Sequence, residues 1–130
     1  MAWIIIYYVQ PLKVSPMNLV NVVVRDLIPT EKIISDNIEK VTNYIGIDPS
    51  KWPPIIVSPE LYILDGHHRR EIALRLSFDV IPAYCVSYFD PKIKVYDYSD
   101  GTPLDKTTLL KIYQSGVVLN PKTTRHIFEK

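Results

Sequence analysis

The sequence predicts an α+β fold, on the basis of two observations. Short apolar segments rich in β-branched and aromatic residues recur along the chain, which is typical of strands. Three other segments carry apolar residues at helical spacing. Because the two kinds of segment do not alternate strictly, we expect a small mixed sheet with about three main helices. The expected strands are residues 3–9, 19–24, 55–57, 61–64 and 83–88.

The first helix is expected after Ser35 or Asp36 as N-cap, and it should end near Gly46. Its apolar stripe consists of Ile38, Val41 and Ile45. Residues 67–76 form the second helix, with Ile72 and Leu76 on the core side.

The third helix is expected to begin at Asp105 and to stop at Gly116. Its core-facing residues are Leu109, Ile112 and Tyr113. Residues 89–103 and those after Gly116 are expected to be loops or short strands.

The composition suits one domain spanning residues 1–130, because 47% of the residues are hydrophobic and can build one core. Fifteen Lys and Arg against 14 Asp and Glu give no excess charge that would attract nucleic acid or an anionic membrane. The single cysteine, Cys85, rules out an internal disulfide framework and favours a reducing cytoplasm. The apolar run at residues 2–9 lacks a basic start and is too short to span a bilayer.

The segment Asp65-Gly66-His67-His68-Arg69 stands where an apolar strand is expected to turn into a helix. The free backbone N–H groups at the start of a helix form an anion site. Glycine allows a close backbone approach, and the His and Arg side chains add donors for phosphate oxygens. We therefore expect this turn to hold a phosphate-bearing ligand.

Asp65 is the acidic member of that turn, and a phosphate would repel it without a compensating role. It could cap the helix, bind Mg²⁺ or accept a proton from a reacting hydroxyl. The alternative is that Asp65 only caps the helix and that the neighbouring His and Arg residues form a solvated polar end.

The motif and its surroundings resemble the ParB/sulfiredoxin superfamily, and within it most closely the archaeal free L-serine kinases. The motif is followed by a helix rich in alanine and leucine and by Val-Ile-Pro-Ala at residues 80–83. Three further segments match in the family's order: residues 26–31 (Asp-Leu-Ile-Pro-Thr-Glu), 52–57 (Trp-Pro-Pro-Ile-Ile-Val) and 121–126 (Pro-Lys-Thr-Thr-Arg-His). The resemblance implies a ParB/sulfiredoxin-like fold and a kinase that uses ATP or ADP to phosphorylate free L-serine.

By this resemblance, Glu31 is the base that takes the serine hydroxyl proton, and Asp65 assists catalysis at the nucleotide, either directly or through Mg²⁺. The expected contacts to the nucleotide and its phosphates are Gly66, His67, His68, Arg69, Lys122, Thr123, Thr124, Arg125 and His126. Trp52 and Tyr62 are candidates for stacking, and Arg70 or Arg69 could bind the serine carboxylate. Because the chain is compact, a second subunit could complete the substrate pocket, as in a homodimer.

Other functions are weighed against this one. A sulfiredoxin activity needs a cysteine at the position of His67, so it is excluded. A ParB-like DNA-binding or nuclease role would normally bring a helix-turn-helix domain and a basic face, and neither is recognisable. A non-catalytic nucleotide-binding regulator is disfavoured because a pure binder has little use for two acids, Glu31 and Asp65, beside phosphates.

Overall fold

A computed structural model of the protein describes residues 18–128, so the strand expected at residues 3–9 lies outside the described range. The elements are β1 (Asn18–Val23), η1 (Val24–Asp26), α1 (Asn37–Ile45), η2 (Pro49–Lys51), β2 (Ile55–Val57), β3 (Ile63–Asp65), α2 (His67–Arg75), β4 (Val80–Cys85), β5 (Ile93–Asp97), α3 (Lys106–Gln114) and β6 (Thr124–Phe128), where η marks a 3-10 helix. The α+β class and the three helices agree with the sequence.

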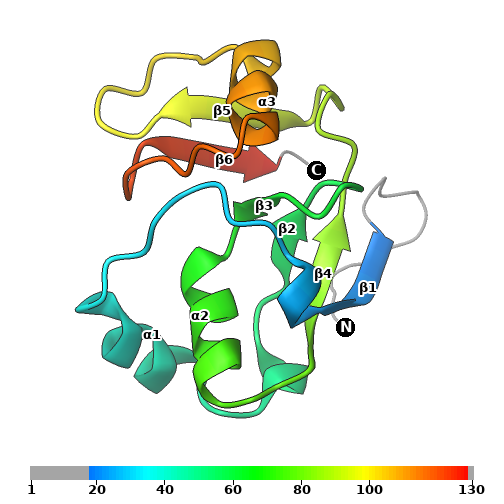
Figure 1. Ribbon diagram of the computed structural model, residues 1–130, viewed down its shortest axis with the longest axis vertical. Coiled ribbons are helices and arrows are strands. Elements are labelled where there is room, and N and C mark those ends of the chain that lie inside the picture. The colour runs from blue at the N-terminus through cyan, green and yellow to red at the C-terminus, as the bar shows by residue number, and fades with distance from the viewer. Residues whose placement is uncertain (1–17, 129–130) are drawn as a thin grey trace.

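Four strands form a mixed sheet in the order β1-β4-β2-β3. Strand β4 is antiparallel to β1 and parallel to β2, and β2 is antiparallel to β3. Helices α1 and α2 pack together beside this sheet (Figure 1). Ile72 and Ala73 of α2 are buried in a first hydrophobic cluster with Ile55, Ile63 and Ile81 of the strands. This packing fixes the start of α2 against the ends of β2 and β3.

The antiparallel pair β5–β6 and helix α3 form the second part of the molecule, with β6 beside β3 (Figure 1). A second hydrophobic cluster lies here and includes Leu109 and Tyr113 of α3, Ile93 and Val95 of β5, and Leu64 of β3. Because Leu64 belongs to this cluster and its neighbour Ile63 to the first, strand β3 joins the two parts immediately before the Asp-Gly turn.

Two local expectations need correction. Strand β4 begins at Val80 rather than near Ala83, and Pro82 lies inside it. Pairing with β2 starts only at Ala83, so the missing N–H of Pro82 falls beyond the end of that ladder. Leu76 was expected on the core side of the second helix, but it is 40% exposed because α2 ends at Arg75.

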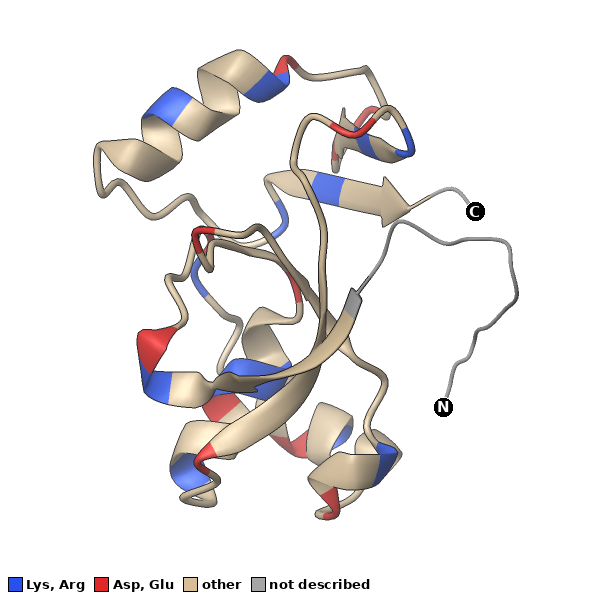
Figure 2. Cartoon of the chain, turned by 90° about the vertical axis from the view of Figure 1, so that its right-hand side faces the viewer, with Lys and Arg blue, Asp and Glu red and all other residues tan. Residues whose placement is uncertain are grey.

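Charge is mixed over both parts of the molecule. In Figure 2 the Lys and Arg segments are interspersed with Asp and Glu segments. Within the described residues, no helix is long and apolar enough to cross a membrane.

Candidate functional site

The turn from β3 into α2 depends on Gly66. This residue has φ +117°, and a Cβ built on it would lie 2.2 Å from Cγ2 of Ile55. Only glycine therefore lets the chain pass this close to β2 and enter the helix. No side chain caps α2 within the described residues, and its first backbone bond runs from Arg70 N–H to Gly66 O. The N–H groups of the first turn are thus available to an anion, and Asp65 is not the helix cap.

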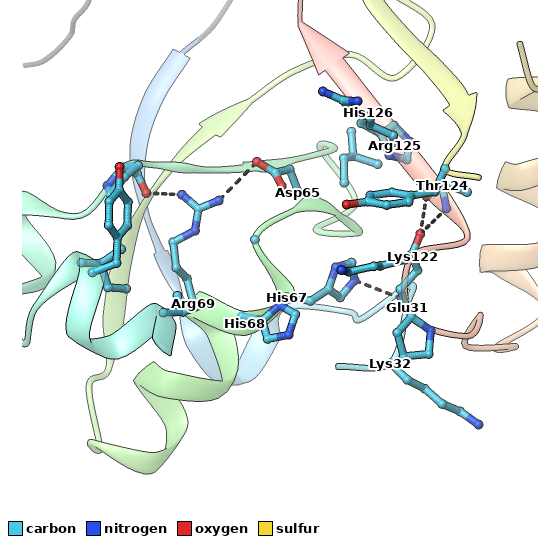
Figure 3. Close-up of a pocket in the computed structure, with 18 residues that line it drawn as sticks. Glu31, Lys32, Asp65, His67, His68, Arg69, Lys122, Thr124, Arg125 and His126 are labelled. Atoms are coloured by element: carbon cyan, nitrogen blue, oxygen red, sulfur yellow. Dashed lines mark hydrogen bonds and ion pairs between the residues drawn. The ribbon is translucent and has the colours of Figure 1, made fainter. Parts of the chain in front are cut away.

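A cavity of about 550 Å³ opens at this turn. It lies between the two parts of the molecule, and side chains from α1, the β3–α2 turn and the start of β6 face it (Figure 3). The lining residues are Glu31, Lys32, Val41, Tyr44, Ile45, Pro53, Leu64, Asp65, Gly66, His67, His68, Arg69, Tyr98, Pro121, Lys122, Thr124, Arg125 and His126. Most of the residues expected to form the site are therefore brought together.

The main chain around Glu31 is held from two directions. Leu119 donates to Thr30 O at 2.9 Å and accepts from Lys32 N–H at 2.8 Å, which makes a short parallel bridge beside Glu31. On the other side, the Nε2 atom of His67 accepts from both Thr30 N–H and Glu31 N–H at 3.0 Å. These contacts fix the backbone from which the Glu31 carboxylate projects.

The Glu31 carboxylate is held by Thr124 at the start of β6. Its Oε2 atom accepts from the Thr124 N–H at 2.9 Å and also from the Thr124 hydroxyl (Figure 3). Thr124 is only 9% exposed. The other carboxylate oxygen, Oε1, has no hydrogen-bond partner among the described residues.

The position of His67 differs from the expectation that its side chain binds a phosphate. Since Nε2 accepts two backbone hydrogen bonds, the ring proton must be on Nδ1. Burial lowers the pKa of His67 to about 4, only partly offset by the negative charge of Asp65. The ring is therefore neutral near pH 7 and connects the start of α2 to the backbone of Glu31, instead of presenting a positive charge.

His68 and Arg69 are also engaged with protein groups. His68 Nε2 accepts from Ile34 N–H at 3.3 Å, and partial burial lowers the pKa of His68. Arg69 donates from Nη1 to Pro53 O at 2.6 Å and from Nη2 to Asp65 Oδ2 at 3.2 Å. The Arg69 side chain is 14% exposed against 55% for Asp65, so the partly buried guanidinium orients a carboxylate that remains open to the cavity (Figure 3).

The start of β6 and the residues just before it contribute two exposed cations, Arg125 and Lys122, to the cavity. Lys122 has φ +57°, and its Nζ lies 5.7 Å from the centre of the Tyr98 ring. Arg125 is exposed, and the described residues provide it with no ion pair. Thr123, in contrast, does not line the cavity, because its hydroxyl donates to Asn120 O at 2.6 Å within the turn. The expected phosphate contact of Thr123 is therefore not supported.

His126 lies deeper than its tail position suggested. Burial lowers its pKa to about 4, its Nε2 is 3.0 Å from the Tyr88 hydroxyl, and its buried Nδ1 has no partner among the described residues. This ring is a neutral wall of the cavity at pH 7 rather than a cation.

Three expected ligand contacts do not lie at the cavity. Trp52 is 3% exposed, its indole N–H donates to Gly46 O at 2.8 Å, and its ring packs edge-on against Phe78. It is a core residue. Arg70 does not line the cavity, and Tyr62 packs against Tyr113 in the second cluster.

Several lining residues were not expected from the sequence, and they include Lys32, Tyr44 and Tyr98. Tyr44 is 87% exposed and lies three positions after Val41, so it extends the apolar stripe of α1 out to the cavity. That spacing was a usable signal. Tyr98 follows β5, which was not assigned as a strand from the sequence, so no sequence signal indicated Tyr98.

A divalent cation fits this site only together with a phosphate ligand. The described residues contain no group of three His, Cys, Asp or Glu side chains that could hold a metal ion. Asp65 offers one exposed carboxylate at the cavity. Mg²⁺ commonly takes one or two carboxylates and completes its shell with substrate phosphates and water, so Asp65 suits that kind of binding.

Comparisons with known proteins agree with this geometry. No protein-family model matches the chain. It is 30% identical over 93 residues to an ATP-dependent L-serine kinase of Staphylothermus marinus, which covers 65% of this chain and 37% of that protein. It is 27% identical over 95 residues to a ParB-like protein of Sulfolobus acidocaldarius, covering 72% and 48%. The chain thus spans less than half the length of either relative.

Solved structures show the same fold. A free serine kinase in complex with AMP superimposes with a TM-score of 0.70 at 14% identity, over 88% of this chain and 89% of that one. A conserved hypothetical protein from Pyrococcus furiosus gives a TM-score of 0.69 at 16% identity, over 88% and 93%. The chain therefore has the fold of these structures, which agrees with the expected α+β class. The expected resemblance to the serine kinases is confirmed.

Proposed function

We propose that this protein is a nucleotide-dependent kinase that transfers a phosphoryl group from ATP or ADP to the hydroxyl of free L-serine and gives O-phosphoserine. The observation that carries the proposal is the presence of two carboxylates, Glu31 and Asp65, on one cavity with an uncapped helix N-terminus between them. A helix start that can bind phosphate accounts for a nucleotide ligand. The carboxylates on either side of the helix start suit phosphoryl transfer.

The donor nucleotide is proposed to place its phosphates at the start of α2. The free N–H groups there, the close backbone approach at Gly66 and the exposed cations Lys122 and Arg125 all suit phosphate oxygens. The apolar wall from α1, with Val41 and Tyr44, suits the nucleobase. This division assigns the α1 side of the cavity to the base and the β6 side to the reacting phosphates.

Glu31 is proposed to act as the general base. Its free Oε1 takes the proton from the serine hydroxyl as the serine oxygen bonds to the terminal phosphorus of the nucleotide. The bond from that phosphorus to its bridging oxygen breaks, and ADP or AMP leaves. A carboxylate held by two hydrogen bonds is well oriented for this role.

Asp65 is proposed to act on the nucleotide side, where Arg69 holds it at the cavity. If Mg²⁺ accompanies the nucleotide, Asp65 would hold it, and the ion would neutralise charge on the phosphates. Arg69 already donates to Pro53 O and to Asp65 Oδ2, so we assign the serine carboxylate to other cations. Lys32, Lys122 and Arg125 are the lining cations that remain open to it.

The test is to incubate the protein with Mg²⁺, L-serine and either ATP or ADP, and to follow O-phosphoserine by phosphorus NMR. We expect product with at least one donor, and we expect Glu31→Gln and Asp65→Asn each to lower its rate of formation by at least about 100-fold. If no donor gives phosphoserine while the nucleotide still binds, the kinase proposal is wrong and a nucleotide-dependent binding module, as in ParB-like proteins, takes its place.

A further inference from the structure

The contact between Glu31 and Thr124 joins two segments that lie 93 positions apart in the sequence. Both donors of Thr124, its N–H and its hydroxyl, bind the same oxygen, Oε2 of Glu31. Oε1 therefore remains as the atom that can receive a proton. By resemblance alone, Thr124 had been expected to bind a nucleotide phosphate. In the structure its hydroxyl already donates to a carboxylate.

We propose that Thr124 is a positioning residue for the general base: it fixes the Glu31 carboxylate so that Oε1 meets the acceptor hydroxyl. This inference rests on the proposed function, because it assigns the role of Thr124 within that reaction. It separates Thr124 from Lys122 and Arg125, which face the same cavity but hold no catalytic acid.

The surroundings of the contact make it rigid. Thr124 is the first residue of β6 and pairs with Asp97 of β5. Glu31 is fixed by the His67 ring and by its bridge to Leu119. The backbones of both partners are thus held in place by hydrogen bonds, so the two groups already face each other before substrate binds.

The groups buried behind the contact also favour a fixed Glu31 carboxylate. Thr30 is 2% exposed, and its hydroxyl donates to Ile63 O at 2.7 Å. Tyr113 is 4% exposed, and both burial and the negative charge of Glu31 raise the pKa of its phenol. Water is thus largely excluded from the Thr124 side of the carboxylate, where a hydrogen bond to a charged group counts most.

The test separates positioning of the base from phosphate binding. Thr124→Val removes the hydroxyl but keeps a β-branched side chain of similar shape that suits β6. We expect the kcat for phosphoserine formation to fall about 10- to 100-fold, the range for losing a hydrogen bond to a charged group. The Kd for ADP should stay within about twofold. Thr124→Ser, which keeps both donors, should restore most of kcat.

A double-mutant cycle with Glu31→Gln gives the decisive result. If Thr124 acts through Glu31, adding Thr124→Val to Glu31→Gln should lower kcat by less than about twofold. Independent, multiplying effects would overturn the proposal, and so would a rise of tenfold or more in the Kd for ADP with kcat unchanged. Thr108→Val is the matched control, since Thr108 also donates to a carboxylate, that of Asp105, on the exposed start of α3.

One readout does not depend on kinase activity. In the amide NMR spectrum, the Thr124 N–H should shift when Glu31 is replaced by Gln, because its acceptor changes from a carboxylate oxygen to an amide. An unchanged Thr124 resonance would refute the contact itself. If the resonance shifts but the wild-type protein makes no phosphoserine, the contact stands and the proposed function is what fails. Should Thr124→Val not fold, Thr124→Ala gives the same cycle.

Discussion

Replacing Gly66 by alanine should damage both the stability of the protein and its ligand-binding turn. The new Cβ would lie 2.2 Å from Cγ2 and 2.6 Å from Cβ of Ile55, where real contacts stay above 3.0 Å. Rotating the side chain of Ile55 cannot relieve the second overlap, because its Cβ is fixed to the backbone of β2. The residue would also keep φ near +117°, which L-residues rarely adopt.

The magnitude has two parts. A left-handed backbone costs an L-residue about 1–2 kcal/mol. Forcing extra carbon into a packed core costs about another 1–3 kcal/mol. We therefore expect Gly66→Ala to lower the free energy of unfolding by roughly 2–5 kcal/mol, measured by equilibrium urea denaturation.

Gly116→Ala is the matched control for that measurement. Gly116 also has a positive φ, +84°, but a Cβ there would meet nothing within 4 Å. It should lose only the backbone part, about 1–2 kcal/mol. If the two variants lose the same free energy, within about 0.5 kcal/mol, the reasoning about the close approach to Ile55 is refuted.

Three other perturbations test the site. Burial lowers the pKa of His67 to about 4, whereas in the unfolded chain it is about 6.5. Between these pH values the unfolded chain binds more protons than the folded one, so the fold loses stability as the pH falls. The contribution of this ring is complete above pH 6.5, and its loss by pH 4 is on the order of 3 kcal/mol. The pH dependence of urea unfolding should flatten over that window in His67→Gln, and an unchanged dependence would contradict the assignment. Tyr44→Ala should raise the KM for the nucleotide about tenfold while Tyr44→Phe does not, if the exposed ring stacks on the base; equal KM values would refute the stacking. In Arg69→Lys the side chain cannot reach both Pro53 O and the carboxylate of Asp65, so kcat should fall about tenfold. The control Arg75→Lys, in an exposed i,i+4 pair with a glutamate, should leave kcat unchanged. Similar kcat values for the two variants would contradict the role of Arg69 in orienting Asp65.

The local features of the fold could be predicted from the sequence. The N-cap at Asp105, the stop at Gly46 and the strand-to-helix turn at Gly66 all depend on neighbouring residues, and all are found in the structure. Strands β5 and β6 were left undecided because charged residues interrupt them. Ile93 and Val95 alternate with Lys94 and are buried, so a period of two was present but short.

The roles of the polar side chains were harder to predict because packing between distant segments decides them. Whether His67 faces a phosphate or a backbone N–H depends on where residues 30–31 cross the start of α2. The partner of Glu31 comes from the last strand. Trp52 looked like a stacking residue, but burial against Phe78 made it part of the core. The sequence indicated which residues form the site, whereas tertiary contacts determine which partner each side chain binds.

The most direct test of the central claim measures phosphoserine formation and nucleotide binding on the same preparations of wild type and Glu31→Gln. The proposed function predicts that wild type forms O-phosphoserine from L-serine and ATP or ADP. It also predicts that Glu31→Gln binds the nucleotide with unchanged Kd and loses the reaction by at least about 100-fold. Wild-type turnover in Glu31→Gln would contradict the assignment of Glu31 as the base.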